Sequence, residues 1–95
     1  MKVRLTSRAA ADIGRIYLEG ARQFGLTQAD TYQRGLMDSI SVIADHPFLA
    51  HERTIFRQPV RIHAYKSHVI AYLVDDLGVL VVRILHAHQN MRRIL

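Results

Sequence analysis

The residues near the end of the chain are the ones that most plainly suggest chemistry. An apolar run, "VVRIL", leads into His86 and His88, and a short basic tail, "MRRIL", follows. Residues two apart on a strand point to the same face, so the two imidazoles could approach one metal ion. A zinc site takes three or four protein ligands, and no further ligand lies nearby at a standard spacing. His63 and His68 could approach only across the sheet. We therefore predict no metal and no cofactor.

A basic surface is the second candidate. Aromatic neighbours such as Tyr65 or Tyr72 could stack on bases while cations hold phosphates. The same cations could equally bind the carboxylates of an acidic peptide. The candidate cations are Arg61, Lys66, Arg83, Arg92 and Arg93.

A nuclease site is the third candidate, and it demands more than cations. Cleaving RNA without a metal needs a general base, a general acid and a cation at the phosphate. His86, His88 and Glu52 could supply the acid and the base, but their spacing is not diagnostic. The sequence has no glycine-rich phosphate loop and no nucleophile motif, and Asp75-Asp76 reads as turn chemistry. We predict no catalytic residue.

Two helices are predicted in the first half of the chain, after a short strand at "KVRL". Apolar residues recur at helical spacing up to Phe24, with Thr6 or Ser7 as the cap and Gly25 as a left-handed terminator. A second helix is expected from an N-cap at Thr27, paired with Asp30, to the residues before Pro47. The link "GLT" is so short that the helices must form an antiparallel αα-hairpin.

Three antiparallel strands are predicted in the second half, in "VRIHAY", "HVIAYLV" and "VLVVRILHA". Residues 46–59 read as a crossing loop, with a short extended piece around residues 54–56. The first strand alternates apolar residues with Arg61, His63 and Tyr65, and Gly78 suits a tight turn. We expect one α+β domain over residues 1–95, in which one sheet face packs on the hairpin. The other face should stay partly open and carry basic and aromatic side chains.

Composition narrows the class of partner. The chain has 95 residues, a net charge of +5, eleven arginines against two lysines, and no cysteine. Its apolar runs are far too short to span a bilayer, so we expect a cytoplasmic protein without a membrane partner. Arginine pairs bidentately with carboxylate or phosphate, so the excess predicts an anionic partner, either nucleic acid or an acidic peptide.

An ordered set of motifs resembles the RelE/ParE superfamily of toxins from bacterial type II toxin–antitoxin modules, and within it the ParE branch. The resemblance runs over almost the whole chain, from "YLEGARQFGLTQADTYQRGLMDSISVIADHP" through "ER" to "VRIHAYKSHVIAYLVDDLGVLVVRILHAHQNMRRIL". Its most distinctive part is "Y-x-S-H-V-I-x-Y", an acidic-glycine turn, and a last strand that ends in "R-I-L-H" before a glutamine. The chain departs from the ParE pattern at His88, where arginine is more usual.

This resemblance implies a toxin that inhibits DNA gyrase by binding, is associated with plasmid stabilization and is neutralised by a ParD-like antitoxin with an acidic C-terminal arm. No sequence-specific DNA binding is expected of the toxin alone. One alternative is a ribosome-dependent mRNA endonuclease of the RelE type, whose members often use a tyrosine near the C-terminus; this chain has none after Arg83. Another is a non-toxic binding protein of the same fold. The expected partner-binding residues are Arg61, Tyr65, Arg83, His86, Arg92 and Arg93.

Overall fold

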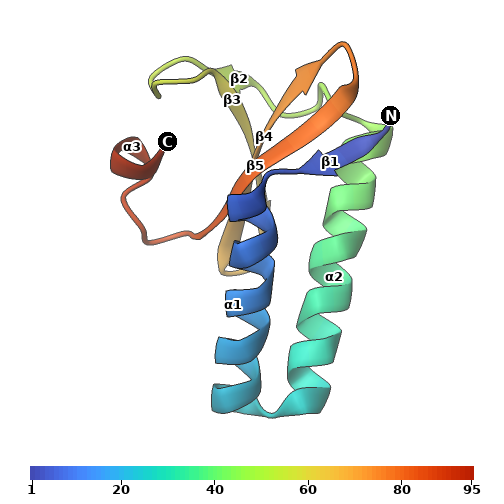
Figure 1. The fold of residues 1–95 in the computed structure, drawn as a ribbon, viewed down its shortest axis with the longest axis vertical. Helices are drawn as coiled ribbons and strands as arrows, with labels where there is room; N and C mark the ends of the chain where they lie inside the picture. Colours follow the sequence, from blue (N-terminus) through green and yellow to red (C-terminus); the bar gives the residue numbers. More distant parts are fainter.

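The computed structural model describes residues 1–95 as a helical hairpin packed on one face of a five-stranded sheet (Figure 1). The sheet order is β1-β5-β4-β3-β2, with a short third helix after the last strand. In chain order the elements are β1 (Val3–Leu5), α1 (Ser7–Phe24), α2 (Leu26–Asp45), β2 (Glu52–Arg53), β3 (Val60–Tyr65), β4 (His68–Asp75), β5 (Gly78–His86) and α3 (Met91–Ile94).

The helical hairpin forms as predicted, with one difference at its turn. Thr6 caps α1, since its hydroxyl accepts from the Ala9 N–H at 3.0 Å. Gly25 has φ 90° and separates the helices alone, so α2 already begins at Leu26 and the expected N-cap at Thr27 is wrong. Asp30 instead accepts from the Tyr17 hydroxyl at 2.6 Å, which ties the two helices together.

The sheet contains the three predicted antiparallel strands, the short strand predicted at "KVRL", and one strand that was not predicted, β2. β1 adds in parallel beside β5, with Val3 opposite Val79, because the hairpin returns the chain to the sheet next to its own start. β2 pairs with the first two residues of β3. The expected extended piece at residues 54–56 is therefore wrong, because the pairing falls at Glu52–Arg53. Gly78 has φ 123°, and a Cβ there would meet the Lys2 carbonyl.

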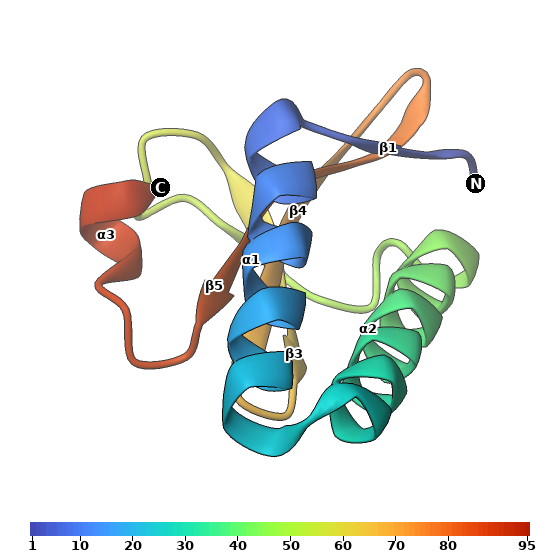
Figure 2. The ribbon, with the colours of Figure 1, turned by 60° about the horizontal axis from the view of Figure 1, so that its bottom comes forward.

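Both faces of the sheet are covered, which corrects the expectation of an open face. The larger cluster lies under α1 and α2 and includes Leu36, Ile43, Tyr72 and Ile84. A smaller cluster lies on the far face, where α3 and the loop before β3 cover the sheet (Figure 2). Its buried members are Phe56, Val60, Val69, Ala71, Leu85 and Leu95.

The two faces of β3 are therefore the opposite of what the sequence analysis suggested, which was the apolar face against the hairpin and the face with Arg61 and Tyr65 left open. Its apolar residues Val60 and Ile62 belong to the far-face cluster, whereas Tyr65 packs against the cluster under the helices. The second cluster exists because the chain has enough apolar residues after α2 to build it, and α3 brings Leu95 over them. The polar residues Arg61 and Tyr65 consequently lie between sheet and hairpin, where they need internal partners.

Candidate functional site

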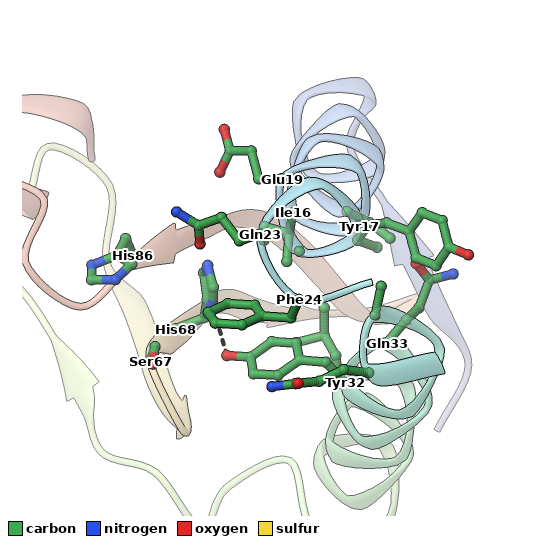
Figure 3. A pocket seen from close by; sticks show the side chains of 15 residues that line it. Ile16, Tyr17, Glu19, Gln23, Phe24, Tyr32, Gln33, Ser67, His68 and His86 are labelled. Carbon is green, nitrogen blue, oxygen red and sulfur yellow. Dashed lines mark hydrogen bonds between the residues drawn. The ribbon is translucent and has the colours of Figure 1, made fainter. Parts of the chain in front are cut away.

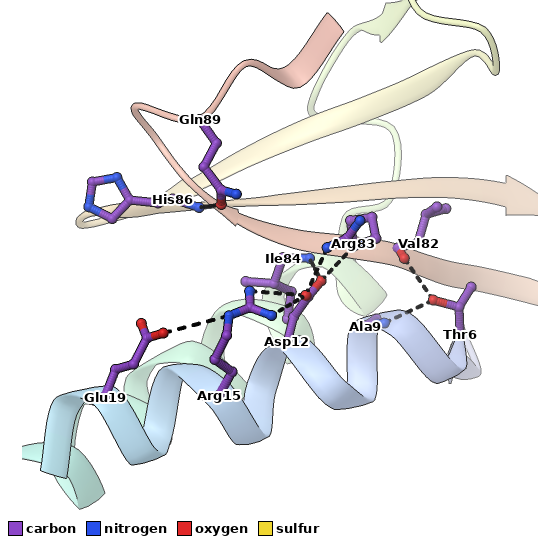
Figure 4. A network of polar contacts seen from close by, with 10 residues as sticks. All are labelled: Thr6, Ala9, Asp12, Arg15, Glu19, Val82, Arg83, Ile84, His86 and Gln89. Atoms are coloured by element: carbon purple, nitrogen blue, oxygen red, sulfur yellow. Dashed lines mark hydrogen bonds and ion pairs between the residues drawn. The ribbon is translucent and has the colours of Figure 1, made fainter. Parts of the chain in front are cut away.

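A buried carboxylate, Asp12, organises the contact between α1 and β5 (Figure 4). Asp12 is 1% exposed and accepts from the Arg83 Nε at 2.8 Å, from the Arg83 Nη2 at 3.0 Å and from the Ile84 N–H at 2.9 Å. Burial raises the pKa of Asp12, but the bonds from Arg83 and Ile84 outweigh it, so the net pKa is lowered. The hydrogen bonds that Arg83 donates to Asp12 raise the pKa of Arg83 in turn. Arg83 thus has a structural role.

Sequence reasoning missed Asp12. The signal was present: one acidic residue, Asp12, lies at the same helical spacing as Ala9 and Ile16, on the stripe that α1 buries. A charged residue is almost never fully buried unless it is paired. An acidic residue on an apolar helical stripe therefore predicts an arginine partner elsewhere in the chain. The sequence did not indicate which of eleven arginines it would be.

Arg61 and Tyr65 are also engaged internally. The Arg61 guanidinium donates to the Ala50 carbonyl at 2.6 Å, and its Cζ lies 5.1 Å from the centroid of the Phe48 ring. The Tyr65 hydroxyl donates to the Tyr32 carbonyl at 3.2 Å. These two predicted partner-binding side chains are therefore half-buried parts of the contact between β3 and the hairpin side.

The histidines form a cluster that the sequence only partly indicated. β5 ends at His86, so His88 lies in the following turn, and their ring centroids are 5.1 Å apart. His68 joins them from β4 with its ring 5.4 Å from that of His86, and its Nδ1 lies 2.7 Å from the Tyr32 hydroxyl. Burial, followed by the charge of His86, lowers the pKa of His68, so His68 is neutral at neutral pH. His63 does not take part.

This cluster borders a cavity of about 390 Å³ between the tip of the hairpin and the end of the sheet (Figure 3). Ile13, Ile16 and Leu36 give it an apolar wall, while Glu19 and Gln23 are among its polar residues. No group of three or more His, Cys, Asp or Glu side chains is placed to hold a metal ion. With its apolar wall and its rim of polar side chains, the cavity is suited to an apolar side chain that has polar groups beside it.

The predicted tail cations lie beside a second groove, of about 300 Å³, on another side of the molecule. It runs between the start of α1, the loop before β3 and α3, and is lined by Arg8, Gln58 and Leu95 among others. Arg92 and Arg93 are exposed on α3, whereas Leu95 is buried. The structure thus separates the six predicted residues: Arg61, Tyr65 and Arg83 hold the fold, His86 borders the cavity, and the tail arginines face solvent.

Most of the cations are exposed and have no carboxylate partner. Of the thirteen Lys and Arg residues, only Arg4, Arg15, Arg61 and Arg83 have a carboxylate within ion-pair distance. The other nine are exposed and without such a partner: Lys2, Arg8, Arg22, Arg34, Arg53, Arg57, Lys66, Arg92 and Arg93.

Comparison with known proteins assigns the family. Residues 3–91 match the model of the ParE toxin of type II toxin–antitoxin systems, parDE. The chain is 36% identical to Toxin ParE1 of Caulobacter vibrioides over 89 residues, which cover 94% of this chain and 92% of that protein. The chain belongs to the ParE toxin family of type II toxin–antitoxin systems.

A solved structure shows the same fold. It is described as the chromosomal ParDE toxin–antitoxin system from P. aeruginosa, and it superimposes with a TM-score of 0.78 at 19% identity, over 90% of this chain and 95% of that chain. The resemblance read from the sequence is confirmed at the level of the family, and the α+β class is confirmed by the fold. None of the helices has the length and apolar character needed to cross a membrane.

Proposed function

We propose that this ParE-family toxin acts by binding, that its target is DNA gyrase, and that a ParD-like antitoxin with an acidic C-terminal arm neutralises it in the cytoplasm. One observation carries the proposal: the cations split into two groups. Arg61 and Arg83, on the strands, are bonded inside the protein, whereas nine other cations are exposed and unpaired.

This division favours binding over catalysis. A phosphate-cleaving site needs a cation free to stabilise developing charge at the scissile group. Arg61 and Arg83 cannot do so without giving up their partners, and the Tyr72 hydroxyl is likewise occupied, donating to the Pro47 carbonyl at 2.8 Å. Free surface cations instead suit an acidic polypeptide, which they attract over a distance and pair with on contact.

The alternative, ribosome-dependent mRNA cleavage, has one observation in its favour. His68 is a neutral imidazole held by the Tyr32 hydroxyl, and the exposed His86 lies beside it. Such a pair could in principle supply a base and an acid. No exposed, unpaired arginine is among the residues that line the adjoining cavity, so the arrangement is incomplete for phosphate chemistry.

The test compares both activities in one preparation. Purified toxin should inhibit supercoiling by gyrase, and a stoichiometric amount of the antitoxin encoded next to it should restore supercoiling. The same toxin should leave mRNA intact in a translating extract. Codon-specific cleavage that disappears in His68→Gln and persists in His63→Gln would reverse the ranking. Normal growth of a susceptible bacterium with abundant free toxin would favour a non-toxic binding protein.

A further inference from the structure

Three arginines lie in one row along the exposed side of α1. Arg8, Arg15 and Arg22 follow one another at intervals of seven residues, which is close to two helical turns, so their side chains project from nearly one line along the helix. All three are exposed. Successive members of this arginine row are about 10 Å apart, because an α-helix rises about 1.5 Å per residue. The helix itself therefore fixes a regular spacing of positive charge.

The arginine row lies on the side of α1 that faces away from α2. Tyr17 marks the side that meets α2, because its hydroxyl donates to Asp30. By helical geometry the row is about half a turn round the axis from Tyr17. Arg8 instead lines the groove that α1 shares with α3, and Figure 2 shows α1 between α2 on one side and α3 on the other. The row and α3 therefore belong to the same flank of the molecule.

Acidic residues are scarce on this flank. Glu19 is the one exposed acidic residue of α1, and its carboxylate lies 3.8 Å from the Arg15 Nε. Residues 77–95, which end in the exposed Arg92 and Arg93 of α3 and the residues after them, contain no acidic residue. The other long helix, α2, carries three. Charge is thus segregated, with a net positive flank along α1 and α3.

Small side chains separate the arginines of the row. Ala11 and Gly14 are exposed, and a Cβ at Gly14 would meet nothing within 4 Å. Leu18 is the only large apolar side chain exposed along the row. An acidic peptide that docks stably needs apolar anchors as well as charge, whereas a phosphate backbone needs cations and a close approach. The composition of the row therefore favours a phosphate backbone over an acidic polypeptide.

Aromatic side chains are absent from this flank of α1. Tyr17 is bonded to α2, Phe24 borders the cavity at the tip of the hairpin, and α3 contains no aromatic residue. Proteins that hold single-stranded nucleic acid stack its bases on aromatic side chains. A duplex keeps its bases stacked inside and presents a phosphate charge for about every 1.7 Å of its axis. Regularly spaced cations can pair with such a backbone at any sequence.

We propose that the arginine row, with the neighbouring cations of α3, is a binding site for the phosphate backbone of a nucleic-acid duplex, without sequence preference. Arg8 and Arg22 are free to pair with phosphates, because neither has a carboxylate within ion-pair distance. Arg15 contributes less, since its guanidinium donates to Asp12 at 3.1 Å. The inference goes beyond the proposed function and does not depend on it, because contact with a duplex needs neither gyrase nor antitoxin.

Fluorescence anisotropy of a labelled DNA duplex of about 20 base pairs, titrated with purified toxin, tests the proposal. The slope of log affinity against log salt concentration should be about −2 or steeper, since each phosphate that is neutralised contributes about −0.9. Arg8→Gln with Arg22→Gln should weaken binding at least about tenfold at about 0.05 M NaCl and make the slope shallower by about 1.8. Glutamine keeps the helix propensity of arginine, and a thermal melt verifies the fold. Two duplexes of unrelated sequence should bind alike.

A matched control separates the row from net charge. Arg34→Gln with Lys66→Gln removes the same charge from exposed positions outside the row, and should weaken duplex binding less than about threefold. Equal losses in the two double variants, or no duplex binding by the unaltered toxin at low salt, would overturn the proposal. If Arg8→Gln with Arg22→Gln weakens binding of polyglutamate as much as binding of the duplex, the occupant is an acidic polypeptide and the proposal is also wrong. None of these outcomes bears on gyrase inhibition, which is measured separately.

Discussion

Asp12 is the single residue on which the contact between α1 and β5 depends most. Replacing it with Asn removes the charge that Arg83 and the Ile84 N–H hold in a buried site. Breaking a buried pair in this way leaves a cation without its partner, and we expect a loss of about 2–4 kcal/mol in the free energy of unfolding. Urea unfolding at pH 7 measures it. Asp38→Asn, an exposed position without an ion pair, should change stability by less than about 0.5 kcal/mol.

The Asp12 contribution should depend on pH with a definite sign. Its pKa is lowered in the folded state, so the contribution is complete above the unfolded pKa of about 3.9 and is lost as pH falls through the folded value. The difference in unfolding free energy between the natural protein and Asp12→Asn should therefore be constant above about pH 5 and shrink below about pH 4. A difference that grows on acidification would contradict this account.

Gly35 and Gly14 are a matched pair of helical glycines in different surroundings. A Cβ at Gly35 would collide with the Tyr65 hydroxyl and lie 2.8 Å from its Cζ, whereas nothing lies within 4 Å of one at Gly14. Gly35→Ala should destabilise by about 1–3 kcal/mol through overpacking. Gly14→Ala should stabilise by about 0.5–1 kcal/mol through helix propensity. Thermal melts compare the two, and equal effects would mean that Tyr65 moves aside at little cost.

At the level of elements, α3 and the residue that follows it separate exposed cations from a buried apolar side chain. Arg92 and Arg93 are exposed, so Arg92→Glu with Arg93→Glu should change the free energy of unfolding by less than about 0.5 kcal/mol per site. The pair should nevertheless weaken antitoxin binding or gyrase inhibition by at least about tenfold, or 1.4 kcal/mol. A melt, a binding titration and a supercoiling assay provide the measurements.

Leu95, the residue that caps the end of α3, supplies the contrasting variant. It is 9% exposed and belongs to the far-face cluster with Val60 and Leu85. Leu95→Ala should lower the melting temperature, with a loss of about 1–3 kcal/mol, because it opens a cavity at the end of the chain. If the double arginine variant loses stability and Leu95→Ala does not, the assignment of roles within α3 is wrong.

For the whole molecule, net positive charge should control how fast an acidic partner arrives. With a net charge of +5 and nine unpaired cations, the association rate constant with the antitoxin should fall by about tenfold or more between 0.05 and 0.5 M NaCl. The dissociation rate should change much less, since close contacts are screened less than long-range attraction. Stopped-flow mixing separates the two rates. An association rate that is flat with salt would show that the free cations do not steer the encounter.

Local patterns in the sequence were sufficient to predict the two long helices and the three long strands. Helical spacing, the cap at Thr6, Gly25 and Pro47 placed the hairpin, and alternation in "VRIHAY", the apolar runs after it and the turn at Gly78 placed the last three strands. These features act over a few residues, so they can be read without the fold. β1 was predicted as a short strand, but its parallel place beside β5 was not, and β2 was misplaced to residues 54–56, because the pairing of such short strands depends on residues elsewhere in the chain.

The sequence by itself determined the α+β class, the hairpin, the antiparallel strands, the excess of arginine and the resemblance to the ParE branch. Only the tertiary structure decided which cations are free. Arg83 is bonded to Asp12, 71 residues earlier, and Arg61 to the Ala50 carbonyl, whereas Arg92 and Arg93 remain in solvent. The physical reason is that an arginine on an alternating strand is equally compatible with either face. Its role is set by the burial of the face it occupies and by the carboxylate that the fold brings there.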